Sequence, residues 1–326
     1  MANSTPLHVV TGKGGTGKTT VAAALALALA GRGLKVLLCE VEGRQGIAQL
    51  FDVPPLPYEE RRIATSDEGG QVHALAIDPE AALLEYLQMF YRLGRAGRAL
   101  DKFGVIDFAT TIAPGVRDVL LTGKIYEAAR RRRAGPSSPF VYDAVVVDAP
   151  PTGRIARFLG VNDDVAGLAK VGPIKSQSES VMTMMRAPQT TVHLVTVLEE
   201  MPVQETLDGI EELTREGLPV GHVVVNLVRP SLLSEDTVAA LEAERLTAKT
   251  VAPVLEKVGL PRDAAGTLVA DGLGHIERQR LQDEQRKIIE DCGRPHVSLP
   301  MLTETMDLGC LQELATHLVP LAEDAR

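Results

Sequence analysis

The sequence predicts an α/β fold: a mostly parallel, doubly wound sheet with helices on both faces and an inserted helical subdomain. Two observations predict the sheet. Short apolar runs that are typical of buried strands alternate along the chain with segments of helical length and pattern. The first of these runs leads into a glycine-rich loop and then directly into a helix, which is the start of a phosphate-binding unit.

The glycine-rich loop matches the phosphate-binding pattern G-x-x-x-x-G-K-[ST] without a mismatch. Its residues are Gly12, Lys13, Gly14, Gly15, Thr16, Gly17, Lys18, Thr19 and Thr20. An apolar strand candidate (7–10) precedes the loop, and an Ala/Leu-rich helix candidate (21–30) follows it. Glycines let backbone N–H groups approach phosphates closely, and the helix dipole favours their charge. We therefore expect a P-loop NTPase sheet that binds ATP, with Lys18 on the β- and γ-phosphates and Thr19 on Mg²⁺.

A lysine directly after the first glycine gives this loop its deviant form. In this respect it resembles a family of dimeric ATPases that includes septum-site and plasmid-partition ATPases, nitrogenase iron protein, and the arsenite-pump and tail-anchored-protein-targeting ATPases. The resemblance implies that Lys13 crosses a dimer interface and neutralises charge on the phosphoryl group in the partner's site. A solvated lysine is the alternative, and the sequence leaves it open.

Composition limits the remaining classes of protein. With 326 residues, 45% hydrophobic and 24% charged, the chain is an ordinary globular protein, which we expect to form one ATPase domain over residues 1–326. Its net charge of −9 argues against a nucleic-acid partner. Three cysteines make no paired framework, and no apolar run approaches the roughly 18 residues of a membrane span. We expect a cytoplasmic protein that is not integral to a membrane.

Glu40 and Glu42 follow a second apolar strand candidate (35–39) and fall at the sheet edge where ligands bind. The ATPases that this chain resembles have Asp-x-Asp or Ser-Thr-Asp here, and the last Asp orients the attacking water. Glu42 matches that position and keeps the carboxylate, but its side chain is one methylene longer. A shift on the order of 1 Å in such a group costs about 10²-fold in rate. We expect Glu42 to be catalytic, with slow hydrolysis unless the loop compensates; a surface acid is the alternative.

The predicted helical subdomain comes from two insertions, at about 80–135 and 160–190. Asp78-Pro79, after a strand candidate at 71–77, is a helix start, and this junction closely resembles that of the arsenite-pump and tail-anchor-targeting ATPases. Residues 80–134 carry no strand signal, and their helices are expected to break at Gly94, Gly104 and Pro114-Gly115. The basic run 130–133 is either a solvated helix end or an anion or lipid site.

Asp148 ends another apolar strand candidate (142–147), and an Asp at this place usually holds Mg²⁺, often through water. The segment 149–153, Ala-Pro-Pro-Thr-Gly, resembles the second switch of the arsenite-pump and tail-anchor-targeting branch, Asp-Thr-Ala-Pro-Thr-Gly-His. Arg154 stands where those ATPases have His. The match selects this branch, in which a switch loop couples hydrolysis to a distant helical surface.

Met182, Met184 and Met185 lie close together in the second insertion. Methionine clusters suit adaptable apolar binding surfaces, and in the tail-anchor-targeting relatives this part of the fold helps form a groove for a client's transmembrane helix. Core packing is the alternative. Exposure of the three side chains discriminates between the two.

The carboxyl ends of the last two strand candidates resemble adenine-binding elements of the family. Asn226 ends the strand candidate 221–226, and Pro300, Met301 and Leu302 follow the strand candidate 296–299. Ordinary turn chemistry and a simple strand-to-helix loop are the alternatives. The charged helical region 231–290 lacks the Cys-x-x-Cys that joins two subunits through zinc in eukaryotic tail-anchor-targeting ATPases, so we predict no zinc. Because the cysteines are far apart in the sequence, we expect no arsenite site.

Two functions follow. The first is an ATP-binding, Mg²⁺-dependent ATP-hydrolysing switch that acts as a homodimer, or as a heterodimer with a paralogous ATPase. Its nucleotide state would control a helical surface for a protein or membrane-segment client. The second is a catalytically weak regulatory or scaffolding subunit that binds ATP beside a paralogous partner ATPase. Glu42 and Arg154, which replace family residues, favour the second.

Overall fold

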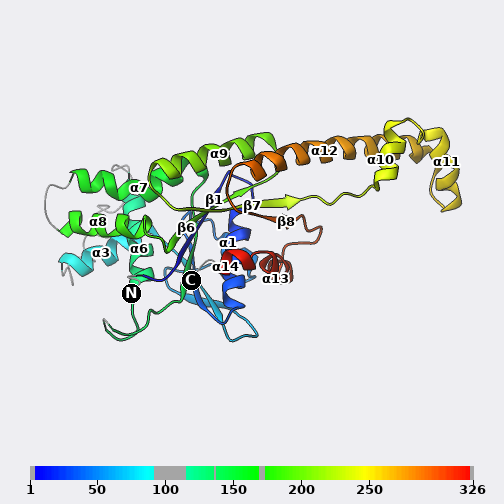
Figure 1. Cartoon of the computed structure of the whole chain (residues 1–326). Helices are drawn as coiled ribbons and strands as arrows, with labels where there is room; N and C mark the ends of the chain where they lie inside the picture. Colours follow the sequence, from blue (N-terminus) through cyan, green and yellow to red (C-terminus); the bar gives the residue numbers. More distant parts are fainter. Residues whose placement is uncertain (1–3, 92–114, 136, 169–172, 324–326) are drawn as a thin grey trace.

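The computed structural model describes residues 4–91, 115–135, 137–168 and 173–323. In this part of the chain one sheet runs in the order β3-β4-β2-β5-β1-β6-β7-β8 (Figure 1). Its strands are β1 (Leu7–Gly12), β2 (Lys35–Glu40), β3 (Arg61–Thr65), β4 (Gln71–Ala76), β5 (Ala144–Asp148), β6 (Thr190–Thr196), β7 (Val220–Val228) and β8 (His296–Pro300). All neighbours pair in parallel except β3 and β4, so the predicted α/β class is confirmed.

The central strands are buried because their residues are apolar on both faces, as parallel sheets require. Every residue of β1 and β5 is buried, including the run Val145–Val147. The edge strand β3 was not predicted. Its first residues, Arg61 and Arg62, are exposed, and it pairs antiparallel to β4. A polar edge strand of this kind carries no apolar run for a sequence pattern to detect.

In the part of the chain that the structure describes, four helices cover one face of the sheet around a shared apolar core. They are α1 (Lys18–Ala30), α2 (Gly46–Leu50), α13 (Leu308–His317) and α14 (Val319–Glu323). The alanines of α1 allow it to lie close to the strands, and residues 21–26 are fully buried. As predicted, the helix ends before Gly31, and Gly33 takes a φ of 80°, a left-handed conformation that favours glycine.

On the opposite face, the described residues form five helices. They are α3 (Pro79–Tyr91), α6 (Val116–Arg130), α7 (Thr152–Leu168), α8 (Pro173–Met185) and α9 (Glu200–Arg215). Met182, Met184 and Met185 are 4%, 5% and 0% exposed, so they pack in the core and form no apolar surface. The predicted helix breaks at Gly94, Gly104 and Pro114 lie outside the described residues.

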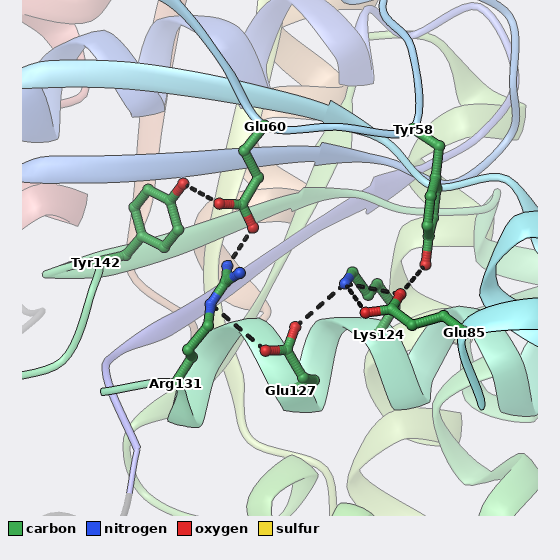
Figure 2. Close-up of polar contacts among 7 residues, drawn as sticks. All are labelled: Tyr58, Glu60, Glu85, Lys124, Glu127, Arg131 and Tyr142. Carbon is green, nitrogen blue, oxygen red and sulfur yellow. Dashed lines mark hydrogen bonds and ion pairs between the residues drawn. The ribbon is translucent and has the colours of Figure 1, made fainter. Parts of the chain in front are cut away.

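Figure 2 shows a network of polar side chains that binds α6 to the sheet and to α3. Its members are Tyr58, Glu60, Glu85, Lys124, Glu127, Arg131 and Tyr142. Two cations, Lys124 of α6 and Arg131 directly after it, connect the acids of the network. The Nζ of Lys124 lies 2.9 Å from the Oε1 of Glu85 and 3.3 Å from the Oε2 of Glu127. Arg131 pairs with Glu60, which also accepts a 2.6 Å hydrogen bond from Tyr142. Each charge has a partner of opposite sign, so the C-terminal half of α6 is held to its neighbours.

The network also changes the pKa of Glu85. Burial raises the pKa of Glu85, but hydrogen bonds from Tyr58 and Lys124 outweigh burial and lower it overall.

The basic run 130–133 lies at the end of α6. The Cζ atoms of Arg130 and Arg132 lie 4.9 and 4.1 Å from the ring centroids of Tyr126 and Phe140. The cations are thus committed to local contacts.

Three helices form an arm, residues 229–293, that projects from the body beyond β7 and returns to β8 (Figure 1). They are α10 (Glu235–Glu242), α11 (Ala248–Lys257) and α12 (Ala265–Asp291). Leu241, Leu255 and Ile276 are buried in the arm. Most of the large exposed apolar side chains of the described residues also lie on it: Leu232, Val254, Val258, Leu260, Leu268, Leu273, Leu281 and Ile288. Among the described helices, none combines the length and apolar character of a membrane span.

Three histidines from distant parts of the sequence meet inside the sheet, on β1, β6 and β7. The Nε2 of His193 lies 3.1 Å from the Nδ1 of His8, and the Nδ1 of His193 accepts the backbone N–H of His222 at 3.3 Å. Because Nδ1 accepts, neutral His193 carries its proton on Nε2 and donates it to His8. Burial, together with the neighbouring imidazoles, holds the pKa of His193 well below its usual value.

This burial predicts a loss of stability in mild acid. Below about pH 6.5 the unfolded chain binds a proton at residue 193 that the folded chain does not, so the free energy of unfolding falls by up to about 1.4 kcal/mol per pH unit from this group. We expect His193→Gln to lower that slope between pH 6.5 and 5, measured by urea unfolding. His317→Gln, at an exposed position, is the matched control. An identical slope in both variants would contradict the assignment.

Candidate nucleotide-binding site

The phosphate loop lies between β1 and α1, and the fold requires glycine at two of its positions. A Cβ on Gly12 would lie 2.2 Å from the carbonyl oxygen of Val195 on β6. A Cβ on Gly17, whose φ is 87°, would lie 2.3 Å from the Nδ2 of Asn226. Both contacts are closer than any side chain permits. The loop is therefore held tightly between the carboxyl ends of neighbouring strands, with its N–H groups at the start of α1.

Thr19 and Asp148 come together at the centre of the site. The Oγ1 of Thr19 donates a 2.7 Å hydrogen bond to the Oδ2 of Asp148. Burial raises the pKa of Asp148 to about 6, although the hydrogen bond from Thr19 and the charge of Lys18 act in the opposite direction. Burial likewise lowers the pKa of Lys18, against the attraction of Asp148 and Glu42. A buried acid and a buried cation thus face the same small region.

These donors fit a magnesium ion. Mg²⁺ prefers hard oxygen ligands and usually binds through one or two protein groups, waters and the substrate's phosphates. The hydroxyl of Thr19 and the carboxylate of Asp148, in hydrogen-bond contact with each other, supply two such oxygen ligands. Thr19 and Asp148 would hold the ion, which would supply positive charge to the β- and γ-phosphates.

Glu40 and Glu42 have separate tasks, although they lie only two residues apart. Glu40 is buried, and its carboxylate accepts the backbone N–H groups of Gln45 and Ile47. These hydrogen bonds therefore hold the conformation of the loop that leads into α2. Glu42 is 21% exposed and lies 3.6 Å from Arg44 and 4.0 Å from Arg154. Its charge acts on both Lys18 and Asp148, as expected for a group beside the phosphate loop.

Lys13 is bound to its own chain. Its Nζ lies 2.5 Å from the Oε1 of Glu205 on α9, and the two side chains are 31% and 37% exposed. The sequence did not predict this partner, because nothing in the pattern of α9 marks Glu205 among its other acids.

The two segments predicted to bind adenine differ in what they contact. Asn226 is buried and its Nδ2 donates a 2.9 Å hydrogen bond to the carbonyl oxygen of Thr16, so it supports the phosphate loop directly. The segment from Pro300 starts beside the end of β7, where the N–H of Met301 donates to Val228 at 2.9 Å. Leu302 packs on the apolar core around α1. The segment 300–302 is thus fixed to β7 at one end and to the core at the other.

Comparison with known proteins identifies the family. Residues 6–188 match the family model described as anion-transporting ATPase. The chain belongs to this family. It is 54% identical over 314 residues to ATPase BagA of Mycobacterium tuberculosis, an alignment that covers 96% of this chain and 92% of that protein.

More distant relatives carry other names. The ATPase is 26% identical to the arsenical pump-driving ATPase of Escherichia coli, over 87% of this chain and 50% of that protein. It is also 26% identical to ATPase GET3 of Candida glabrata, over 67% of this chain and 70% of that protein. These relatives support the predicted branch of the family, and with it ATP as the substrate of this ATPase.

The Thr19–Asp148 pair predicts that loss of the Asp148 charge weakens the effect of Mg²⁺ on ATP affinity. Asp148→Asn keeps the shape and a hydrogen-bond acceptor for Thr19 but removes the charge that a divalent ion needs. We expect the gain in ATP affinity on adding Mg²⁺ to fall at least about tenfold, with affinity in EDTA changed less than about twofold. Isothermal titration with and without Mg²⁺ measures both. Asp143→Asn, at the exposed start of the same strand segment, is the control, and an equal loss in that variant would contradict the assignment.

Proposed function

We propose that this ATPase is a dimeric, Mg²⁺-dependent switch that couples ATP hydrolysis to the binding of a partner protein. The observation that carries the proposal is the convergence of Lys18, Thr19, Asp148 and Glu42 on one phosphate loop. These groups come from three segments, the start of α1, the end of β5 and the loop after β2, and a purely structural role for buried or half-buried charges gathered there would be costly.

The proposed roles follow from the chemistry of each group. Lys18 and the loop N–H groups bind the β- and γ-phosphates, and Thr19 and Asp148 hold Mg²⁺. Glu42 orients a water whose oxygen attacks the γ-phosphorus; the bond from that phosphorus to the bridging oxygen of ADP breaks, and the water's proton leaves with phosphate. Asn226 holds the loop on its adenine side, and the segment 300–302 lies next to it along β7.

We propose that Lys13 acts in trans, on the nucleotide of the second subunit. In the single chain its ammonium is paired with Glu205 on α9. A partner subunit that approaches this face would have to break that pair. The second subunit is either another copy or a paralogous ATPase. We expect the dimer to form without zinc, because Cys292 has no second cysteine near it in sequence.

The partner-binding surface is proposed to lie outside the methionine cluster. Burial of Met182, Met184 and Met185 removes the main sequence support for a client groove on α8. We propose α3, α6, α7 and α8 as the helical subdomain that moves with nucleotide state. The arm offers the larger exposed apolar area, so it is the first place to probe for a bound protein.

The second candidate function is a regulatory subunit with weak catalysis. It is favoured by one observation: Glu42 and Arg154 stand where related ATPases have Asp and His. Such a subunit would bind ATP but depend on a paralogous ATPase for turnover.

Turnover of the purified chain tests the first function against the second. We expect Lys13→Ala to lower Mg²⁺-dependent ATP turnover at least about tenfold with ATP affinity unchanged, because a cation at the transferring phosphoryl stabilises only the transition state. Glu211→Ala on α9 is the control. ATP binding without turnover in the unaltered chain would support the regulatory function instead.

Mixing two inactive variants tests whether Lys13 acts in trans. Lys13→Ala retains an intact phosphate loop, and Lys18→Ala retains the donated lysine. In a homodimer, an equimolar mixture should recover roughly a quarter of the unaltered activity, because about half of the dimers are mixed and each has one complete site. No recovery, with mixed dimers present by crosslinking, would contradict action in trans.

A further inference from the structure

Arg154 connects three parts of the molecule that the sequence did not associate. It lies in the first turn of α7, directly after the loop that begins at Asp148. Its Nη1 is 4.0 Å from the Oε1 of Glu42, and its Nη2 is 3.7 Å from the Oδ1 of Asp118, in the first turn of α6. One guanidinium therefore bridges the loop after β2 to α6.

The contact joins two departures from the family pattern. Glu42 stands where the ATPases that this chain resembles have a shorter acid, and Arg154 stands where they have a histidine. A glutamate has one more rotatable bond than an aspartate, so its carboxylate occupies a larger range of positions. Arginine is long enough to reach such a carboxylate and, with its planar fork, to contact a second acid at the same time.

The other end of the bridge lies on a helix that is tied to its neighbours. Asp118 is 16% exposed, and its helix is tied to α7 by a buried hydrogen bond of 2.9 Å from Asn162 to Thr122. Beyond that, the network of Figure 2 holds α6 to the sheet through Lys124 and Arg131. Arg154 thus contacts both a helix that is tied to its neighbours and a residue of the loop after β2.

We infer that Arg154 is a positioning residue for hydrolysis, which holds the Glu42 carboxylate at the phosphate loop and transmits its position to α6 through Asp118. The inference rests on the proposed function, in which Glu42 orients water. Arg44, 76% exposed at its side chain, completes the support of Glu42 from the other side.

The ion pairs of Arg154 are weak contributors to stability, and this makes the role testable. The side chain is 55% exposed, and exposed pairs typically contribute only about 0–1 kcal/mol. Loss of Arg154 should therefore leave the fold intact. A misplaced carboxylate, by contrast, is expected to lower the rate by about 10- to 100-fold.

The test measures kcat, KM and ADP affinity in Arg154→Ala, Arg154→Lys and Asp118→Asn, beside the unaltered chain. We expect Arg154→Ala to lower kcat by about 10- to 100-fold with KM and ADP affinity within about twofold, and Arg154→Lys to restore part of kcat. Asp118→Asn should lower kcat in the unaltered background but not in Arg154→Ala, because it acts through the same side chain. Arg157→Ala, an exposed arginine one turn further along α7, is the control and should leave kcat unchanged.

Hydrogen exchange supplies a readout that a structural role would not change. On ATP addition, amides in the first turn of α6 should change protection in the unaltered chain and not in Arg154→Ala. Unchanged kcat in Arg154→Ala, or an equal loss in Arg157→Ala, would overturn the inference while leaving the proposed function intact. Absence of turnover in the unaltered chain would instead overturn the proposed function.

Discussion

The hydrogen bond between Thr19 and Asp148 depends on the whole sheet. The two residues are 129 positions apart, and they meet because β1 and β5 are adjacent and parallel, with Val10 paired to Asp148. Parallel strands place their carboxyl ends at one edge, so the residues that follow them converge there. A shift in register of one residue would reverse the direction of Asp148 and separate it from Thr19. Burial of both faces of the central strands stabilises that register.

The same edge gathers charges of both signs. The charges of Asp148 and Glu42 act on the pKa of Lys18, the charges of Lys18 and Glu42 act on the pKa of Asp148, and Lys13 pairs with Glu205 on α9. Water screens such groups poorly when they are buried, so each side chain constrains its neighbours. A nucleotide with its metal would therefore alter several contacts at once, as the proposed switch requires.

The helices on the face of α6 and the helices of the arm differ in how they are packed. The helices on the face of α6 are packed by apolar contacts and tied by the network around Lys124 and Arg131, which suits elements that move as one body. The arm has little core of its own and leaves apolar side chains in solvent. Because the exposed apolar side chains lie mainly on the arm, the arm is the surface that we propose for a partner.

The sequence by itself determined the fold class, the phosphate loop, Asp148 at a strand end, and the family to which the chain belongs. These features are local: a loop pattern with its flanking strand and helix, or an apolar run that ends in one acid, is complete within about twenty residues. Even Glu42 was detectable, because its place after a strand is a local property.

Only the tertiary structure decided which of these groups touch. The pairing of Lys13 with Glu205, the bridge from Glu42 through Arg154 to Asp118, and the histidine contacts of β1, β6 and β7 all join residues that are distant in sequence. Burial of the methionines was equally undecided, since apolar residues at helical spacing suit a core or a binding surface alike. The edge strand β3 and the partner of Lys13 left no periodic signal, because pairing and charge contacts across a fold are set by how its elements pack.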